Sequence, residues 1–359
     1  MTVVELHNTI LEEGDLQPSG YGPRVLTVTK MWPTTAHSMH NGFLKLQVES
    51  LRRTGVSCDV LVTQRYGSGP RGYLATARAV RSAVAAHRYD VIHAHYGLTG
   101  ISCLSHGLPV VLTLHGSDIY GSVADDGHKT VKGRAEAVIS RVAASRAKAV
   151  VVVSHRMASL VPWVDPIVIP IGIDTELFCP IARTLARREL GLDEHRPYVL
   201  FAANPNNPVK RYQLAKRAVD HLRRHYAEVE LLAVHGEPLE RMPLWMSAAN
   251  VLLITSSYEG GPMVHREAMA CGLPIVSVDV GDVAIHLKDV SPSEVVAAEP
   301  EALAEGLRAV IADGRRANGR SLVEATSTAA SATALRRLYL TVADSRPKGS
   351  SRYGRGNVV

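Results

Sequence analysis

The stretch that decides the fold is VLLITSSYEGGPMVHREAMACGLP, residues 251–274. Its first five residues are apolar or β-branched, which is typical of a strand buried in a parallel sheet. Gly260 and Gly261 then allow the backbone to turn sharply and to approach a ligand closely. Pro262 suits the first turn of a helix, and Gly272 ends that helix. The stretch therefore predicts a strand, a glycine loop and a short helix.

The turn from strand to helix is a predicted anion site. Free backbone N–H groups and the positive end of the helix dipole favour a phosphate there. Two carboxylates frame this site, Glu259 in the loop and Glu267 on the helix. Acids beside an anion are unfavourable unless they accept hydrogen bonds from hydroxyl groups, so the pattern favours a nucleotide sugar as the ligand. In the alternative interpretation, Glu259 is a turn residue and Glu267 a solvated helix glutamate.

The same stretch resembles the signature of the family 4 retaining glycosyltransferases, Glu-x7-Glu followed by Ala-Met-Ala-x-Gly-x-Pro. Residues 260–266 separate the two glutamates, and AMACGLP follows as residues 268–274. The resemblance extends from Val25 to Tyr339. It implies the GT-B architecture, in which two Rossmann-like domains face a cleft. It also implies transfer of a sugar, with retention, from a nucleoside diphosphate to an acceptor hydroxyl, and UDP is the commonest donor nucleotide in that family.

The rest of the chain alternates strand-like and helical stretches, which predicts an α/β fold. Two such sets occur, and each predicts a doubly wound parallel sheet. The expected strands are 25–29, 58–62, 91–94, 110–114, 149–153 and 168–170 in the first half, and 198–202, 230–234, 251–255, 275–278 and 295–297 in the second. Ligands bind at the carboxyl ends of such strands, so site residues are expected directly after them.

The chain is expected to divide into five segments, since 359 residues suffice for two domains. The linker PIGID, residues 170–174, resembles the family's P-x-G-x-D. The expected segments are an N-terminal extension (1–22), a Rossmann-like acceptor domain (23–170), a Rossmann-like nucleotide-sugar domain (171–324), a helix that in the family crosses back to the first domain (325–343), and a basic tail predicted to be disordered (344–359).

Lys210 is the clearest candidate for a catalytic cation. It follows a predicted strand and loop and precedes a helix, where an ammonium group could neutralise charge on a leaving diphosphate. In the resembled family an arginine and a lysine share this role. Asn204 or Pro205 occupies the arginine's usual place here, so Arg211 is the expected substitute. Alternatively, the two basic residues form a surface pair at the start of a helix.

The resemblance assigns further roles at the donor site. Glu259 would face the hydroxyls of the transferred sugar and stabilise positive charge on it, and Glu267 would hold the ribose. Gly42 ends a polar loop before a helix, where the family places a glycine near the diphosphate; a simple helix-entry turn is the alternative. The implied donor-binding residues are Gly42, Lys210, Arg211, Gly260, Gly261, Pro262, Met263, Val264 and Glu267.

His115 is the best candidate in the first half of the chain. The sequence His115-Gly-Ser-Asp118 resembles the family's H-G-x-D element, whose histidine approaches the donor sugar near the reaction centre. Together with Glu259 and Lys210, His115 would therefore be catalytic. Asp118 is expected to orient this histidine or to bind the acceptor, and His95 to bind the acceptor. The alternative is a helix cap formed by Ser117 and Asp118.

No metal or cofactor is expected, and the nucleoside-diphosphate sugar is a co-substrate. His93 and His95 could form a metal pair on one strand face, but the sequence offers no third ligand. No Asp-x-Asp loop is present to hold a divalent ion on a diphosphate. The four cysteines are far apart and are expected to be free thiols in a reducing cytoplasm.

The net charge of +6 favours an anionic partner. No nucleic-acid module is visible, which argues against nucleic acid. Residues 127–148 hold six basic residues against one acid, and residues 71–88 hold four arginines and no acid. They could contact an anionic acceptor or the inner face of an anionic membrane, or form a solvated surface. With no signal peptide or bilayer-length apolar run, we expect a cytoplasmic protein, peripheral at most.

Two alternatives to this transferase stay open. One keeps the fold and changes the chemistry to a nucleotide-sugar epimerase or a phosphorylase. The other is a non-catalytic subunit that binds a nucleotide sugar or a glycan, which the missing arginine would allow. The pathway is equally open between surface polysaccharide or glycolipid assembly and secondary metabolism.

Overall fold

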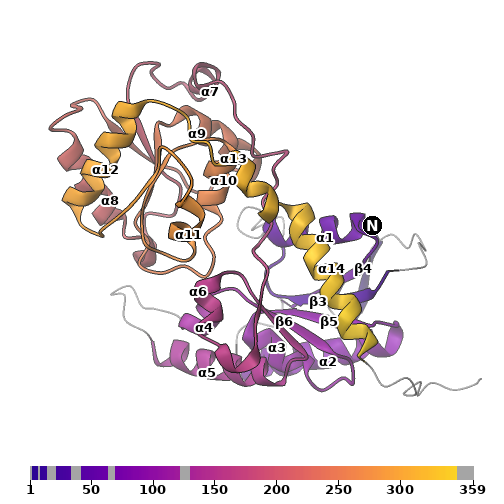
Figure 1. The fold of residues 1–359 in the computed structure, drawn as a ribbon. Helices are drawn as coiled ribbons and strands as arrows, with labels where there is room; N and C mark the ends of the chain where they lie inside the picture. The colour runs from indigo at the N-terminus through magenta and orange to yellow at the C-terminus, as the bar shows by residue number, and fades with distance from the viewer. Residues whose placement is uncertain are drawn as a thin grey trace, which may run out of the picture.

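A computed structural model describes residues 2–6, 9–13, 22–33, 42–63, 69–121 and 130–345. These residues form two α/β domains, and helix α14 (Thr328–Asp344) runs from the second domain along the first (Figure 1). Residues 34–41 of the predicted polar loop and residues 346–359 of the predicted basic tail lie outside the described residues.

The first domain contains an eight-stranded sheet in the order β1-β2-β4-β3-β5-β6-β7-β8. Its strands are β1 (Thr2–Leu6), β2 (Thr9–Glu13), β3 (Arg24–Thr29), β4 (Ser57–Val62), β5 (Val91–His95), β6 (Val110–Leu114), β7 (Ala149–Val152) and β8 (Ile167–Val168). Its helices are α1 (Gly42–Arg53), α2 (Pro70–Ala86), α3 (Gly97–Cys103), α4 (Ser117–Tyr120), α5 (Val131–Arg146), α6 (His155–Ala158) and the 3-10 turn η2 (Pro162–Val164).

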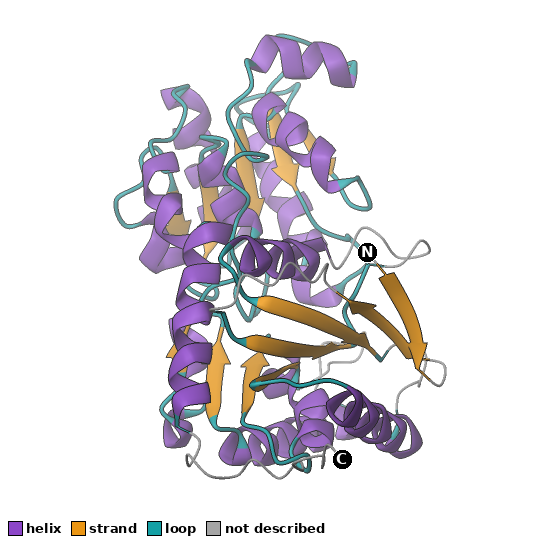
Figure 2. Cartoon of the chain, turned by 90° about the vertical axis from the view of Figure 1, so that its right-hand side faces the viewer, coloured by secondary structure: helices purple, strands orange, loops and turns teal. Residues whose placement is uncertain are grey.

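The strands β3 to β8 run parallel, whereas β1 and β2 form an antiparallel hairpin beside β4. Figure 2 shows this hairpin at one edge of the sheet, next to the N-terminus. The sequence predicted residues 1–22 only as an extension and missed both strands. Their pairing explains the miss, because β2 bonds to Val60–Val62 of β4, some fifty residues later, and a local pattern cannot report such a partner.

The second domain contains a five-stranded parallel sheet in the order β10-β9-β11-β12-β13. Its strands are β9 (Tyr198–Phe201), β10 (Glu230–Ala233), β11 (Val251–Ile254), β12 (Ile275–Val278) and β13 (Glu294–Val296). Its helices are α7 (Arg183–Leu190), α8 (Tyr212–Leu222), α9 (Met242–Ala248), α10 (Val264–Ala270), α11 (Val283–Leu287), α12 (Pro300–Asp313) and α13 (Arg320–Val323), with 3-10 turns η3 (Pro208–Lys210), η4 (Leu239–Arg241) and η5 (Glu324–Thr326). The predicted pair of doubly wound parallel-sheet domains is confirmed.

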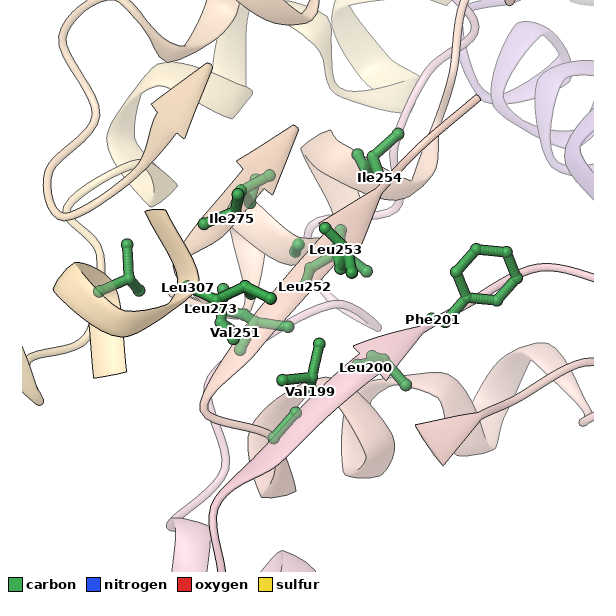
Figure 3. Packing of buried hydrophobic residues seen from close by; sticks show 14 of the residues in the cluster. Val199, Leu200, Phe201, Val251, Leu252, Leu253, Ile254, Leu273, Ile275 and Leu307 are labelled. Carbon is green, nitrogen blue, oxygen red and sulfur yellow. The ribbon is translucent and has the colours of Figure 1, made fainter. Parts of the chain in front are cut away.

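The core of the second domain surrounds β11. All four residues of this strand are buried, and Leu252 lies in register with Leu200 of β9. Side chains from the strands and from α12, such as Leu307, fill the space around them (Figure 3). Both faces of a parallel sheet are covered by helices, so its strands are continuous apolar runs rather than alternating patterns. This is why β11 stands out in the sequence.

The C-terminal helix α14 belongs physically to the first domain. It packs against α1 (Figure 1), and Leu335 and Tyr339 are buried with Leu44 and Leu51 of α1 in the cluster on that face of the first sheet. The hydroxyl of Tyr339 lies 2.7 Å from Nδ1 of His93 on β5. The opposite face of the sheet is covered by α2, α3 and α5, so α14 completes the second covering layer.

The two chain crossings between the domains lie side by side. The amide N–H of Ile173 donates to the carbonyl of Thr326, and that of Thr328 donates to the carbonyl of Ile173. Arg266 on α10 donates to the carbonyl of Ile171, 2.8 Å away. A Cβ at Gly172 would lie 2.5 Å from Cα of Thr328, so glycine permits this close approach. The connections between the domains are therefore held to each other and to the second domain.

We expect Leu335→Ala to lower the free energy of unfolding by about 2 to 5 kcal/mol, because it opens a cavity between α14 and the first sheet. Leu340→Ala, on the half-buried side of the same helix, is the matched control and should cost less. Urea unfolding followed by circular dichroism measures both. Equal effects of the two substitutions would contradict the packing of α14 described above.

Candidate active site

An ion pair lies at the carboxyl ends of the neighbouring strands β9 and β11. Nζ of Lys210, on η3, is 2.5 Å from Oε1 of Glu259, in the loop after β11. The side chains are 26% and 17% exposed, so the pair is partly shielded from water. A small pocket beside it is lined by Phe201, Ile254 and Val264 as well as by the pair itself. The structure thus brings together two of the three predicted catalytic residues.

Arg211 holds the loop that carries Glu259. Its backbone is left-handed, with φ 50°, and its guanidinium donates to the carbonyls of Thr255 (2.5 Å) and Ser256 (3.1 Å). In return, Thr255 Oγ1 donates to the carbonyl of Lys210 at 2.7 Å. Arg211 is therefore engaged in fixing the end of β11, a contact that the sequence did not suggest. Its role as a second phosphate-binding cation stays a prediction.

The double glycine lies against the first domain. A Cβ at Gly260 would be 1.9 Å from the carbonyl oxygen of His115, and one at Gly261 would be 2.8 Å from that of Val153. Neither glycine has a positive φ. The sequence attributed these glycines to a sharp turn and an approach to a ligand, whereas in the structure they permit backbone contact between the domains. Donor binding by their amides stays a prediction.

Helix α10 begins two residues later than the sequence suggested. Pro262 and Met263 precede it, because the first helical hydrogen bonds run from the amides of Arg266 and Glu267 to the carbonyl of Met263. The ring of Pro262 instead packs beside Gly281, where a Cβ would lie 2.7 Å from Cδ of the proline. The helix has seven residues, and the ammonium group of Lys210 supplies a full positive charge at the site.

Glu267 is buried on α10. Burial raises the pKa of its carboxyl group to about 7, although the neighbouring Arg266 opposes the rise. Within the described residues its carboxylate makes no side-chain hydrogen bond. A buried carboxylate of this kind can accept hydrogen bonds from ligand hydroxyl groups. The structure therefore leaves the predicted ribose-binding role of Glu267 open.

The loop after β6 presents His115 at the boundary between the domains. The carboxylate of Asp118 accepts hydrogen bonds from the amides of Gly116 (2.9 Å) and His115 (3.2 Å). Burial raises the pKa of Asp118 to about 6, and these hydrogen bonds limit the rise. Asp118 thus shapes the backbone of the His115 loop, and its predicted role in orienting the histidine ring stays a prediction. Its contact with an acceptor stays a prediction.

His95 is fully buried behind His115. Its Nδ1 is 3.0 Å from Nε2 of His115, and the two rings are stacked. No part of the ring faces solvent, and the expected contact of His95 with an acceptor stays a prediction. The outermost ring of the group, His115, is half-buried between Tyr96 and Phe43.

A second contact between the domains was missed by the sequence analysis. The carboxylate of Asp282, before α11, accepts hydrogen bonds from the amides of His155 (2.7 Å) and Arg156 (3.1 Å), and lies 3.0 Å from Nδ1 of His155. Ser154 Oγ also donates to the carbonyl of Gly260. Helix α6, which begins at His155, and helix α11, which follows Asp282, face each other in Figure 1. Asp282 follows β12 by a few residues, so the rule of strand ends marks its position, although it cannot report the partners of Asp282 in the other domain.

The remaining predictions concern Gly42 and metal ions. Gly42 is the first residue of α1, and a Cβ there would lie 3.9 Å from Leu239 of the second domain. It therefore lies at the domain boundary, as a donor-site residue would. In the part of the chain that the structure describes, no group of three His, Cys, Asp or Glu side chains could hold a metal ion.

Two family models match the chain. Residues 15–166 match the glycosyl transferase 4-like domain, and residues 234–326 match glycosyl transferases group 1. The D-inositol 3-phosphate glycosyltransferase of Xylanimonas cellulosilytica is 31% identical, in a match that covers 65% of this chain and 67% of that protein. The protein of the same name from Pseudarthrobacter chlorophenolicus is 29% identical, in a match that covers 54% of this chain and 55% of that protein. The chain thus spans about half the length of several curated relatives that it matches.

Solved structures show the same fold. Sucrose-phosphate synthase from Thermosynechococcus elongatus gives a TM-score of 0.75 at 20% identity, covering 90% of this chain and all of that chain. Anabaena HepE, in complex with UDP and glucose, gives 0.58 at 18% identity, covering 90% and 97%. The predicted GT-B architecture is confirmed. The chain belongs to the family of group 1 glycosyltransferases, as predicted.

We expect Asp282→Ala to favour separation of the domains, because the amides of His155 and Arg156 lose a charged acceptor at a cost of about 2 kcal/mol. Small-angle X-ray scattering would show a larger radius of gyration. Asp279→Ala is the matched control, since this residue makes only an exposed pair with Arg156 and should change little. Unchanged scattering of Asp282→Ala would contradict the role of this contact.

We expect the affinity for UDP to rise about tenfold between roughly pH 6 and roughly pH 8, because ribose hydroxyls need the ionised form of Glu267, whose pKa is about 7. Calorimetric titration measures the affinity at each pH. Glu267→Gln is the control, because the pH dependence that remains in this variant comes from the ligand's own phosphate. For the stability of the protein without ligand, the pH dependence has the opposite sign. Because burial raises the pKa of Glu267 in the folded state, its contribution to the free energy of unfolding is full below its ordinary pKa of 4.5 and is lost as the pH rises through 7. The same pH dependence of affinity in both proteins would refute the ribose role.

Proposed function

We propose that this protein is a retaining glycosyltransferase that moves a sugar from a nucleoside diphosphate, UDP by preference, to an acceptor hydroxyl. The observation that carries the proposal is the ion pair of Lys210 with Glu259 between the ends of β9 and β11. The ammonium group of Lys210 already lies beside the glycine loop, where it binds the carboxylate of Glu259. A diphosphate would displace that carboxylate and bind the ammonium group in its place. A lysine and glutamate pair that served only the protein surface would not need to lie beside the glycine loop.

In the proposed reaction, Lys210 takes the charge that develops on the leaving diphosphate. Glu259, released from the lysine, accepts hydrogen bonds from hydroxyls of the sugar and stabilises positive charge at the anomeric carbon of the sugar. The bond from that carbon to phosphate breaks, and the bond to the acceptor oxygen forms on the same face. The acceptor's proton passes to the leaving diphosphate. The lysine supplies the charge that a metal ion would otherwise provide, so we propose a reaction without metal or cofactor.

The donor and acceptor proposals differ in their support. HepE, which shares the fold, is in complex with UDP and glucose, which supports UDP as the donor nucleotide. The curated relatives are named for D-inositol 3-phosphate, which supports a phosphorylated polyol as one acceptor to test. Surface polysaccharide, glycolipid and secondary metabolite assembly are the pathways that we propose for such a transferase.

Hydrolysis of donor sugars without acceptor tests the proposal. We expect slow release of UDP, unchanged by excess chelator, and a loss of roughly 100-fold or more in Lys210→Ala and Glu259→Gln. Arg196→Ala is the matched control, because Arg196 makes a 2.9 Å ion pair with Glu230 at the opposite end of β9. Tight UDP binding without turnover under any acceptor would instead favour a non-catalytic binding subunit.

We also propose peripheral contact with an anionic membrane, in a cytoplasmic protein, through the outer face of α5. Val131 (85% exposed) and Val138 (56%) lie on this face, and Trp163 (51%) adjoins it through a 3.1 Å hydrogen bond to Ser145. Exposed basic side chains flank these apolar residues: Lys132, Arg134, Arg141, Arg146 and Lys148. An apolar stripe between basic residues fits the headgroup region of an anionic bilayer. No helix in the described ranges has the length and apolar character needed to cross a bilayer.

Vesicle co-sedimentation tests the membrane proposal. We expect binding to vesicles with about one third acidic lipid, weaker binding to neutral vesicles, and a several-fold loss when Val138 and Trp163 are replaced by serine. The double variant Ile285→Ser and Leu322→Ser removes equally exposed apolar side chains of the second domain and should bind like the unmodified protein. Equal binding to neutral and acidic vesicles would exclude this surface as an anionic-lipid site.

A further inference from the structure

A second cavity lies outside the candidate active site, between α10, α11 and α13 of the second domain. Its volume is about 190 Å³, and its lining shares no residue with the small pocket beside Lys210. Sites for drug-sized ligands have volumes of about 300 to 1,000 Å³, so this cavity has the size for a smaller molecule. All of its lining residues come from the second domain.

The lining of this cavity includes a buried charge, the guanidinium group of Arg266 on α10. Arg266 is 2% exposed, and burial lowers its pKa to about 10, which leaves the group charged near pH 7. A guanidinium group has five N–H donors. In the described part of the chain it makes one hydrogen bond, from Nη1 to the carbonyl of Ile171, and its Nε has no partner. The group therefore has donors left for a ligand.

The carboxylates nearest to this charge do not pair with it. Glu267 and Asp282 attract Arg266 through space, but among the described residues neither forms a hydrogen bond or an ion pair with it. The two oxygens of Asp282 instead accept from the amides of His155 and Arg156. Burial raises the pKa of Glu267 to about 7, so that carboxyl group is only partly ionised near neutral pH. A buried charge without a bonded counterion is unfavourable, and an anion in the cavity would supply one.

Most of the remaining lining is aliphatic. Met269 and Val323 are buried in the wall, whereas Ile285 and Leu322 are 58% and 46% exposed beside the cavity. Small-molecule sites are lined mainly by apolar side chains, with a few polar groups that orient the ligand. The four aliphatic residues therefore favour a ligand with an apolar part as well as a charged end.

A carboxylate in the lining restricts the kind of anion. Asp289, which follows α11, is exposed beside the cavity. The ring of His286 is neutral near pH 7, because burial lowers its pKa, so the positive charge of the lining is that of Arg266. A carboxylate can bind a guanidinium group through two parallel hydrogen bonds. Repulsion by Asp289 grows with the charge of the ligand, so a singly charged carboxylate is favoured over a doubly charged phosphate.

The cavity also adjoins the two chain crossings between the domains. Arg266 donates to the carbonyl of Ile171 on one crossing. The carbonyl of Thr326, another lining residue, accepts from the amide of Ile173. A ligand bound to the remaining donors of Arg266 would keep the guanidinium group where it binds Ile171.

We propose that this cavity binds a small carboxylate with a short aliphatic chain, and that the bound ligand holds the domain crossing at residues 171–173. The carboxylate oxygens lie on Arg266, and the chain lies against Ile285 and Leu322. The site is separate from the candidate active site, so the proposal goes beyond the proposed transfer reaction and does not depend on it.

A titration with 4-methylpentanoate tests the site, followed by magnetic resonance at the methyl groups of Met269 and Val323. The matching neutral amide and inorganic phosphate are the comparison ligands. We expect 4-methylpentanoate to bind at roughly millimolar concentration, and the other two to bind at least about tenfold more weakly. Equal binding of the amide would overturn recognition of the charge, and tighter binding of phosphate would overturn recognition of the chain. Absence of binding by all three would overturn the site.

Substitutions in the lining locate the binding. Arg266→Met removes the charge and should weaken binding of 4-methylpentanoate at least about tenfold. Because Arg266 also binds Ile171, Leu322→Asp is a second variant, in which an exposed residue gains a repelling charge, and we expect binding about fivefold weaker. Leu185→Asp, at a residue that is 47% exposed on α7 and outside the lining, is the matched control and should bind normally. Unchanged binding in Leu322→Asp, or in a folded Arg266→Met, would overturn the proposal.

Amide hydrogen exchange tests the link to the domain crossing. With 4-methylpentanoate at about ten times its dissociation constant, the amide of Ile173 should exchange about tenfold more slowly, because opening of the crossing would release the ligand. The amide of Thr63, which donates to the carbonyl of Thr29 within the first domain, is the control and should not change. Unchanged exchange at Ile173 in the liganded protein would overturn the link to the crossing.

Discussion

The rest of the site depends on one contact, in which the backbone at Gly260 meets the backbone at His115 across the domain boundary. A side chain at residue 260 would begin 1.9 Å from the carbonyl oxygen of His115, so the two chains can approach only because residue 260 has none. The contact brings the loop that bears Glu259 to the loop that bears His115. Groups from two separate sheets thereby become one site, and the bonds of Ser154 and Asp282 secure the same approach from beside it.

Charge and burial give the residues of this site different properties. The positive charge of Lys210 is balanced by Glu259, so the candidate site is not left with an unpaired charge. Burial lowers the pKa of His115 to about 4, so its ring is neutral near pH 7 and adds no charge at the domain boundary. The guanidinium group of Arg211 donates to the carbonyls of Thr255 and Ser256, directly after β11, and keeps the loop in place.

Much of this arrangement could be predicted from the sequence. The strands of both sheets are continuous apolar runs because helices cover both faces, and residues that follow such runs gather at one edge. That rule found Lys210, Glu259 and His115. The contacts that it missed have partners far away in the chain: the hairpin of β1 and β2 pairs with β4, and the carboxylate of Asp282 binds amides of the other domain.

The late start of α10 has a similar cause, because Pro262 packs against Gly281 rather than opening the helix, and Gly281 belongs to the next loop. Local propensity alone cannot report such a neighbour. The crystal structure of a complex with a UDP-sugar tests the account most directly. The account predicts that the bond between Lys210 and Glu259 opens, with the lysine on the diphosphate and the glutamate on the sugar. Nucleotide bound elsewhere, with this ion pair intact, would contradict it.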